Sequence, residues 1–141
     1  MKDKFQKAWL DASSFIKDQA SNIGDSAKEK AYALIHEWMS VFPKLEEYGL
    51  EMSSFALSIA ISPAVEVEMT GLHEQFTMER IDEILKECKQ KPALQSVFTT
   101  IKSTYSLYDR MGKPYTDPLI LKIRIRISPE IRVYIGLPLI E

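Results

Sequence analysis

Two stretches of this chain alternate large aliphatic residues with small or polar ones, and they are the strongest constraint on its fold. The first covers residues 55–69 and the second covers residues 121–135. A period of two places alternate side chains on opposite faces of a β-strand. The pattern predicts strands in both regions, each with one buried and one polar face.

The two regions resemble each other when the sequence is shifted by 66 residues. Residues 57–69 then align with residues 123–135, and a Ser-Pro pair falls at the same place in both, at 62–63 and 128–129. Shared strand patterning inflates such a match, but a matching Ser-Pro is harder to obtain by chance. We expect an internal duplication of a helix-helix-β-hairpin unit, with pseudo-repeat units at residues 1–71 and 72–141 and an approximate twofold relation between them.

Each Ser-Pro is expected to bend the chain into a hairpin. In the first region a three-residue loop pairs Ile61 with Val65 and keeps the large aliphatic side chains on one face. In the second region the same loop places Arg126 opposite Arg132, an unfavourable pair of like charges. The alternative is one long strand kinked at each Ser-Pro, although strands of about 15 residues are uncommon.

The polar residues of the two regions differ in charge. Glu66 and Glu68 belong to the first region, whereas the second carries a basic row with one aromatic residue, made up of Lys122, Arg124, Arg126, Arg132 and Tyr134. Placing both regions in one sheet brings the glutamates beside the basic row and relieves its repulsion. We predict a mainly antiparallel sheet of about four strands, with its aliphatic face covered by helices and its polar face open.

About four helices are predicted from apolar residues that recur at steps of three and four. They span residues 4–20, 26–48, 78–91 and 92–110, and Pro43 is expected to kink the second helix or to begin a separate last turn. Thr77 is the predicted N-cap of the third helix, and Pro92 begins the fourth. The expected fold class is α+β, in a single domain over residues 1–141.

The composition is that of an ordinary folded domain, with 45% hydrophobic and 27% charged residues in a chain of 141. A net charge of -2 gives no basis for general nucleic-acid binding. Since no segment resembles a signal peptide or a membrane-spanning helix, we expect a cytoplasmic location, with at most peripheral membrane contact. The only cysteine, Cys88, falls on the apolar stripe of a predicted helix, which favours a buried, inert thiol.

No arrangement of residues points to catalysis or to a bound metal or cofactor. His36 and His73 lack a third ligand at zinc-like spacing, so we interpret both as surface or boundary residues. The five glycines are scattered at the ends of elements and predict no phosphate-binding loop. An enzyme is the third choice of function, kept because active residues can be dispersed along a sequence.

Two candidate binding surfaces remain. The row Lys122, Arg124, Arg126, Arg132 and Tyr134 is the candidate for a partner protein or an anion, weighed about evenly against neutralisation by Glu66 and Glu68. The second candidate, for an apolar ligand or an interface, consists of Phe5, Trp9, Phe15, Trp38, Met39 and Phe42. We expect a small non-catalytic domain that binds a partner protein or forms a homodimer. The alternative is a carrier or sensor of a lipid or fatty acyl chain, although such side chains more often form a core.

Overall fold

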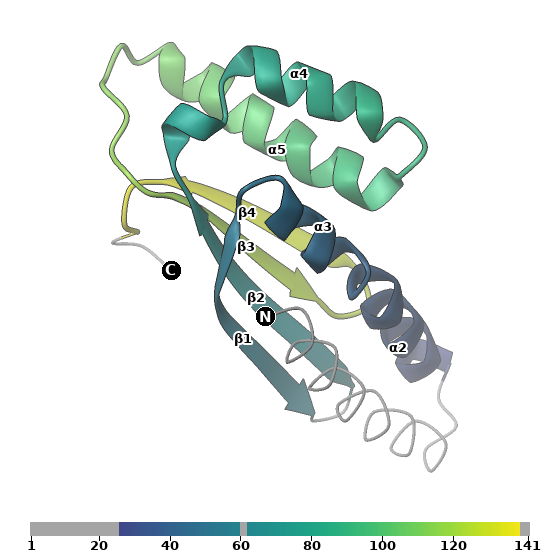
Figure 1. Ribbon diagram of the computed structural model, residues 1–141. Coiled ribbons are helices and arrows are strands. Elements are labelled where there is room, and N and C mark those ends of the chain that lie inside the picture. Colours follow the sequence, from purple (N-terminus) through teal and green to yellow (C-terminus); the bar gives the residue numbers. More distant parts are fainter. Residues whose placement is uncertain (1–25, 60–61, 139–141) are drawn as a thin grey trace.

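Two β-hairpins lie side by side in one sheet, and helices pack on one of its faces (Figure 1). The computed structural model describes residues 26–59 and 62–138. Its elements are α2 (Ser26–Trp38), α3 (Val41–Glu47), β1 (Glu51–Ile59), β2 (Pro63–Gly71), the 3-10 turn η1 (His73–Gln75), α4 (Met78–Glu87), α5 (Pro92–Asp109), β3 (Leu119–Ile125) and β4 (Pro129–Ile135). The predicted α+β class is confirmed.

The sheet has the strand order β1-β2-β3-β4, and each neighbouring pair is antiparallel. The two hairpins meet in the centre, where β2 pairs with β3. There Val67 lies opposite Ile123, and the adjacent Glu66 lies opposite Arg124. The predicted four-stranded antiparallel sheet is confirmed, and so is the placement of the glutamates beside the basic row.

Both hairpins turn before the proline of their Ser-Pro pair. Ile59 pairs with Pro63 in the first hairpin, and Ile125 pairs with Pro129 in the second. A proline has no N–H to donate, and it is tolerated as the first residue of a strand. Each proline accordingly begins a strand, β2 or β4, instead of forming the bend.

The predicted hairpins are thus confirmed, but their predicted pairing is wrong. Val65 lies opposite Leu57 rather than Ile61, and Arg132 lies opposite Lys122 rather than Arg126. Arg126 belongs to the connection between β3 and β4, where its backbone N–H donates to the carbonyl of Ser128 at 3.3 Å. Because each strand is displaced by an even number of residues, the side chains keep their predicted faces.

The helices begin where the sequence predicts, but two of them end earlier: α2 stops at Trp38 and α4 at Glu87, instead of at 48 and 91. The Thr77 hydroxyl caps α4 by accepting the backbone N–H of Arg80 at 3.2 Å, and Pro92 occupies the first turn of α5. Pro43 lies in the first turn of a separate short helix, α3. Of the two outcomes predicted for Pro43, a kink or a separate last turn, the structure shows the second. The helix predicted at residues 4–20 lies outside the described residues, so the count of four is not established.

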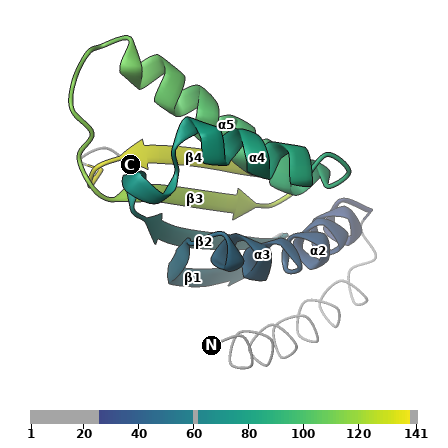
Figure 2. The same cartoon turned by 45° about the horizontal axis from the view of Figure 1, so that its top comes forward.

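The core lies between the helices and the aliphatic face of the sheet (Figure 2). α2 packs against β2 and β3, and α5 packs against β4 and α4. Ile35 and Phe42 meet the sheet from the first pair of helices, whereas Phe98 and Ile101 do so from α5. Cys88 is also buried, as predicted, with its sulfur 3.6 Å from the Tyr48 hydroxyl.

Substitutions on the two sides of α5 test this packing. Ile101 is completely buried, so Ile101→Ala should lower the free energy of unfolding by about 3 kcal/mol through lost burial and the resulting cavity. Leu107, on the same helix, is 62% exposed, and Leu107→Ala should change the free energy by less than about 0.5 kcal/mol. Urea unfolding measures both values. Equal losses at the two positions would contradict the orientation of α5.

Candidate binding face

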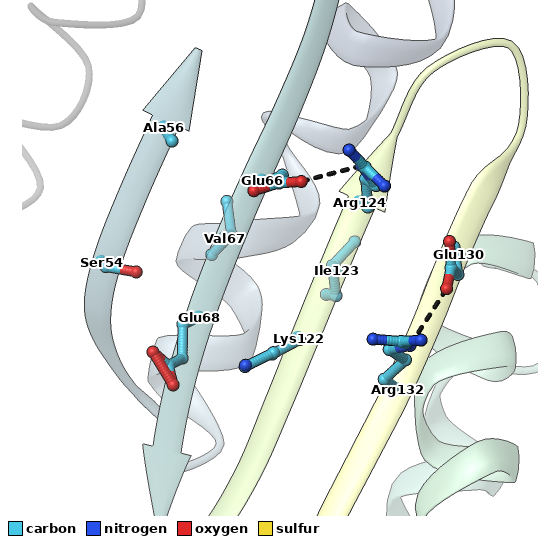
Figure 3. A pocket seen from close by; sticks show the side chains of 10 residues that line it. All are labelled: Ser54, Ala56, Glu66, Val67, Glu68, Lys122, Ile123, Arg124, Glu130 and Arg132. Carbon is cyan, nitrogen blue, oxygen red and sulfur yellow. Dashed lines mark ion pairs between the residues drawn. The ribbon is translucent and has the colours of Figure 1, made fainter. Parts of the chain in front are cut away.

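The sheet face opposite the described helices carries side chains of both charges (Figure 3). We define the polar face by the outward residues of the four strands that surround its central hollow. They are Ser54, Ala56, Glu66, Glu68, Lys122, Arg124, Glu130 and Arg132. Three of these are acids and three are bases, so the face has both signs of charge and no net excess of either.

Strand pairing arranges the polar face into two rows that cross the sheet. The first row is Ala56, Glu66, Arg124 and Glu130, and the second is Ser54, Glu68, Lys122 and Arg132. In each row a small residue of β1 is followed by an acid of β2 and a base of β3. The central strands therefore carry a negative stripe and a positive stripe side by side.

Two ion pairs neutralise part of this charge. The Arg124 Nε lies 2.8 Å from a Glu66 carboxylate oxygen, and the Arg132 Nε lies 3.1 Å from Glu130 (Figure 3). All four side chains are about half exposed, between 47% and 53%. Ion pairs at such exposure contribute only about 0–1 kcal/mol to stability. These charges can exchange partners at little cost to the fold.

The hollow of the polar face is lined by residues of all four strands. β1 contributes only Ser54 and Ala56 there, while β2, β3 and β4 contribute long charged side chains, and the hollow has a volume of about 430 Å³. β1 also carries a bulge at Ser53, whose hydroxyl donates to the carbonyl of Glu68 at 3.0 Å. The bulge anchors β1 to β2 at the end of the hollow.

The structure brings together four of the five residues predicted as a basic surface. Lys122, Arg124 and Arg132 lie on the polar face, and Tyr134 adjoins it one row further along β4. The Lys122 ammonium is 5.1 Å from the Tyr134 ring centre, and Arg132 Nη1 donates to the Tyr134 hydroxyl at 3.3 Å. Arg126, in the strand connection, does not join this row.

The residues predicted for an apolar ligand or an interface fall into two groups. Trp38, Met39 and Phe42 are buried in the core between helices and sheet, where they pack against other side chains. Phe5, Trp9 and Phe15 lie outside the described residues.

Sequence reasoning missed a second cluster, centred on His73. The His73 side chain is only 7% exposed, and its ring contacts the rings of Tyr105 and Tyr115 at centre distances of 5.6 and 5.4 Å. A hollow of about 360 Å³ adjoins these three rings. No local pattern could have revealed the cluster, because its members are widely separated in sequence.

Both nitrogens of the His73 ring are used in hydrogen bonds. Nε2 lies 2.7 Å from the carbonyl oxygen of Thr116, which can only accept, so Nε2 carries the proton. Nδ1 lies 2.8 Å from the Tyr105 hydroxyl, which can donate to it. The Tyr105 phenol is protonated at neutral pH, and burial raises the pKa of Tyr105 further. His73 therefore braces the segment before β3 against the end of β2.

The described residues contain neither a metal-binding group nor a membrane-spanning helix. Among residues 26–59 and 62–138, no group of three His, Cys, Asp or Glu side chains is arranged to hold a metal ion. None of the helices described is both long and apolar enough to cross a bilayer. Comparisons with protein-family models, with curated proteins and with solved structures gave no match to this chain.

Removing the Tyr105 hydroxyl tests the brace. Tyr105→Phe leaves the buried Nδ1 of His73 without its donor, and should lower the free energy of unfolding by about 1–3 kcal/mol. Tyr108→Phe is the matched control, because the Tyr108 hydroxyl donates to the Pro114 carbonyl at an exposed position and should matter by less than about 1 kcal/mol. The brace is refuted if chemical denaturation shows no greater loss for Tyr105→Phe.

Tyr115 provides a test at high pH. Its hydrogen bond to the Asp109 carboxylate, followed by burial, raises the pKa of Tyr115 to about 12 from the ordinary value of 10.0. The folded state favours the neutral phenol, so the resulting stabilisation is present below pH 10 and is lost as the pH rises through about 12. Asp109→Asn should lower this pKa towards 10, measured from the ring resonances by NMR, whereas Asp82→Asn on α4 should leave it unchanged.

Proposed function

We propose that this chain is a non-catalytic protein-binding domain and that the polar face is its contact surface. The observation that carries the proposal is the pair of charged rows around a hollow, on a sheet face that the described helices leave uncovered. The opposite face is occupied by the core, so it has no comparable surface to offer.

The balance of charge favours a protein partner over a polyanion. Three acids and three bases share the polar face, and two of the bases are already paired with carboxylates. A nucleic acid or an anionic membrane would meet repulsion from Glu66, Glu68 and Glu130. A protein surface with its own alternating charges can match both stripes, and such matching supplies specificity and a fast association rate.

The side chains of the polar face suit a reversible contact. Exposed ion pairs such as Arg124–Glu66 contribute little to folding, so a partner can replace one member without a large penalty. The β1 residues Ser54 and Ala56 leave room for larger side chains from outside. Both ring nitrogens of His73 form hydrogen bonds within the fold, so neither is available for proton transfer to a substrate. This agrees with binding rather than catalysis.

We also infer that the two hairpins descend from one duplicated unit. The supporting observation is that both close at equivalent positions, Ile59 with Pro63 and Ile125 with Pro129, at the same shift of 66 residues. The shift relates β1 to β3 and β2 to β4, and it also relates α2, which packs on β2, to the first part of α5, which packs on β4. This relation is a displacement by two strands in the sheet, so the expected twofold relation between the units is wrong.

Site-specific photocrosslinking in the cells of origin tests the proposed contact surface. A photoreactive amino acid replaces Ala56, which lines the hollow, and in a control replaces Ser103, which is exposed on α5. We expect a discrete protein adduct from position 56 that is absent from position 103. Arg124→Glu should abolish the adduct. The substitution places a second acid opposite Glu66, so both central strands become acidic in the first row and no longer match the partner.

An adduct of equal yield from both positions, or one unaffected by Arg124→Glu, would contradict the proposal. The stability of each variant is measured by urea unfolding, so that an unfolded chain is not mistaken for a lost contact. Arg124 is about half exposed, so losing its ion pair should cost the fold no more than about 1 kcal/mol, and repulsion of the new acid by Glu66 and Glu130 should add a loss of roughly the same size.

A further inference from the structure

We propose that the partner of the polar face is a second copy of this chain, stacked face to face with the first. The twofold axis lies between the two copies, runs parallel to the strands, and passes over the boundary between β2 and β3. This inference rests on the proposed function and specifies its partner. It follows from the pairing of β2 with β3, which fixes where each charge would meet its counterpart in the second copy.

The rotation exchanges the two central stripes. Turning a copy about such an axis places its β3 over β2 and keeps every residue at its own level along the strands. Glu66, which pairs with Arg124 within the sheet, then faces the partner's Arg124 as well. Glu68 faces the partner's Lys122 in the next row. Stacked sheets lie about 10 Å apart, a gap that facing glutamate and arginine side chains can bridge.

The charge pattern rejects the other twofold stack. An axis in the plane of the sheet but perpendicular to the strands would place each strand over its own copy. β2 would then set Glu66 against the partner's Glu68, and β3 would set Arg124 against the partner's Lys122. Like charges held this close oppose association strongly, so only the axis parallel to the strands gives a complementary face.

The shape of the face fits the same stack. The rotation that exchanges β2 and β3 also places β4 over the partner's β1. Glu130 and Arg132 are the long side chains of β4, and they would face the partner's Ala56 and the partner's Ser54. These are the small residues that bound the hollow of about 430 Å³. The hollow of each copy would thus receive the outer charged side chains of the other.

The size of the face predicts a weak, reversible dimer. Four strands at the usual spacing span about 19 Å, and about seven residues extend about 23 Å, which gives about 440 Å² for each copy. The two copies together would bury about 900 Å², at the low end for a specific interface. We expect a dissociation constant of about 10–100 µM that rises several-fold between low and high salt, because half-exposed charges are screened.

Sedimentation equilibrium of the full chain, from about 10 µM to about 1 mM, is the test. Glu66→Arg leaves four positive charges facing one another in the stack, and Arg124→Glu leaves four negative ones. Each variant alone should dimerise more than about tenfold less tightly than the original chain. An equimolar mixture of the two should recover dimers, because arginine of one variant then faces glutamate of the other at both positions.

Two controls make the result specific to this geometry. Glu66→Arg mixed with Lys122→Glu has the same overall charges, but it leaves like charges facing each other in both rows, so it should recover dimers less well. Asp82 and Lys102 form an ion pair of comparable exposure between α4 and α5, with 2.7 Å between its charged atoms. Asp82→Lys, Lys102→Asp and their mixture should all dimerise like the original chain.

The outcomes separate this inference from the proposed function. A chain that remains monomeric to 1 mM, or a mixture of Glu66→Arg and Arg124→Glu that recovers no more dimer than the mismatched mixture, overturns the stack. If photocrosslinking at position 56 then captures a different protein in an Arg124-dependent manner, the proposed function is supported and the homodimer is rejected. If position 56 captures nothing, both proposals are rejected. Should Glu66→Arg fail to fold, Glu68→Arg with Lys122→Glu provides the same test in the second row.

Discussion

The antiparallel pairing of β2 with β3 is the contact on which the rest of this structure depends. It joins two hairpins that are distant in sequence, and it settles both faces of the sheet at once. On one face Val67 lies beside Ile123 under the helices, and on the other Glu66 lies beside Arg124. A slip of one residue would exchange the two faces, burying the charges and exposing the aliphatic side chains. The core and the polar face are therefore specified by the same pairing.

The His73 brace acts on this pairing from one end. The last pair between the central strands joins Gly71 to Leu119, and His73 follows β2 by two residues. Its Nε2 donates a hydrogen bond to the carbonyl of Thr116, three residues before β3 begins. The chain must cross from the helices back to the sheet at this point, and the hydrogen bonds of His73 fix where it enters. A buried histidine thus helps to fix the register of the two strands that carry Glu66, Glu68, Lys122 and Arg124 on the polar face.

The sequence predicted what depends on periodicity and missed what depends on distant contacts. Alternation identified the strands and their faces, and the opposite charges of Glu66 and Arg124 correctly predicted that the two regions pair. The turns were misplaced because a loop around Ser-Pro and a loop before it give the same alternation, so parity alone cannot separate them. Whether His73 is buried depends on tyrosines more than 30 positions away, and the residues near His73 in the sequence do not indicate that these tyrosines will pack against it.

The proposed duplication explains why one face can carry separate stripes of charge. At a shift of 66 residues, Glu66 of β2 corresponds to Arg132 of β4, and Ala56 of β1 corresponds to Lys122 of β3. Under the proposed duplication, the core would keep the buried positions apolar in both units, whereas the outward positions would be free to diverge in charge. Since β2 comes from the first unit and β3 from the second, the stripes at the centre belong to different units. A second copy complements both stripes only by placing its second unit over the first, which is the exchange that the proposed axis performs.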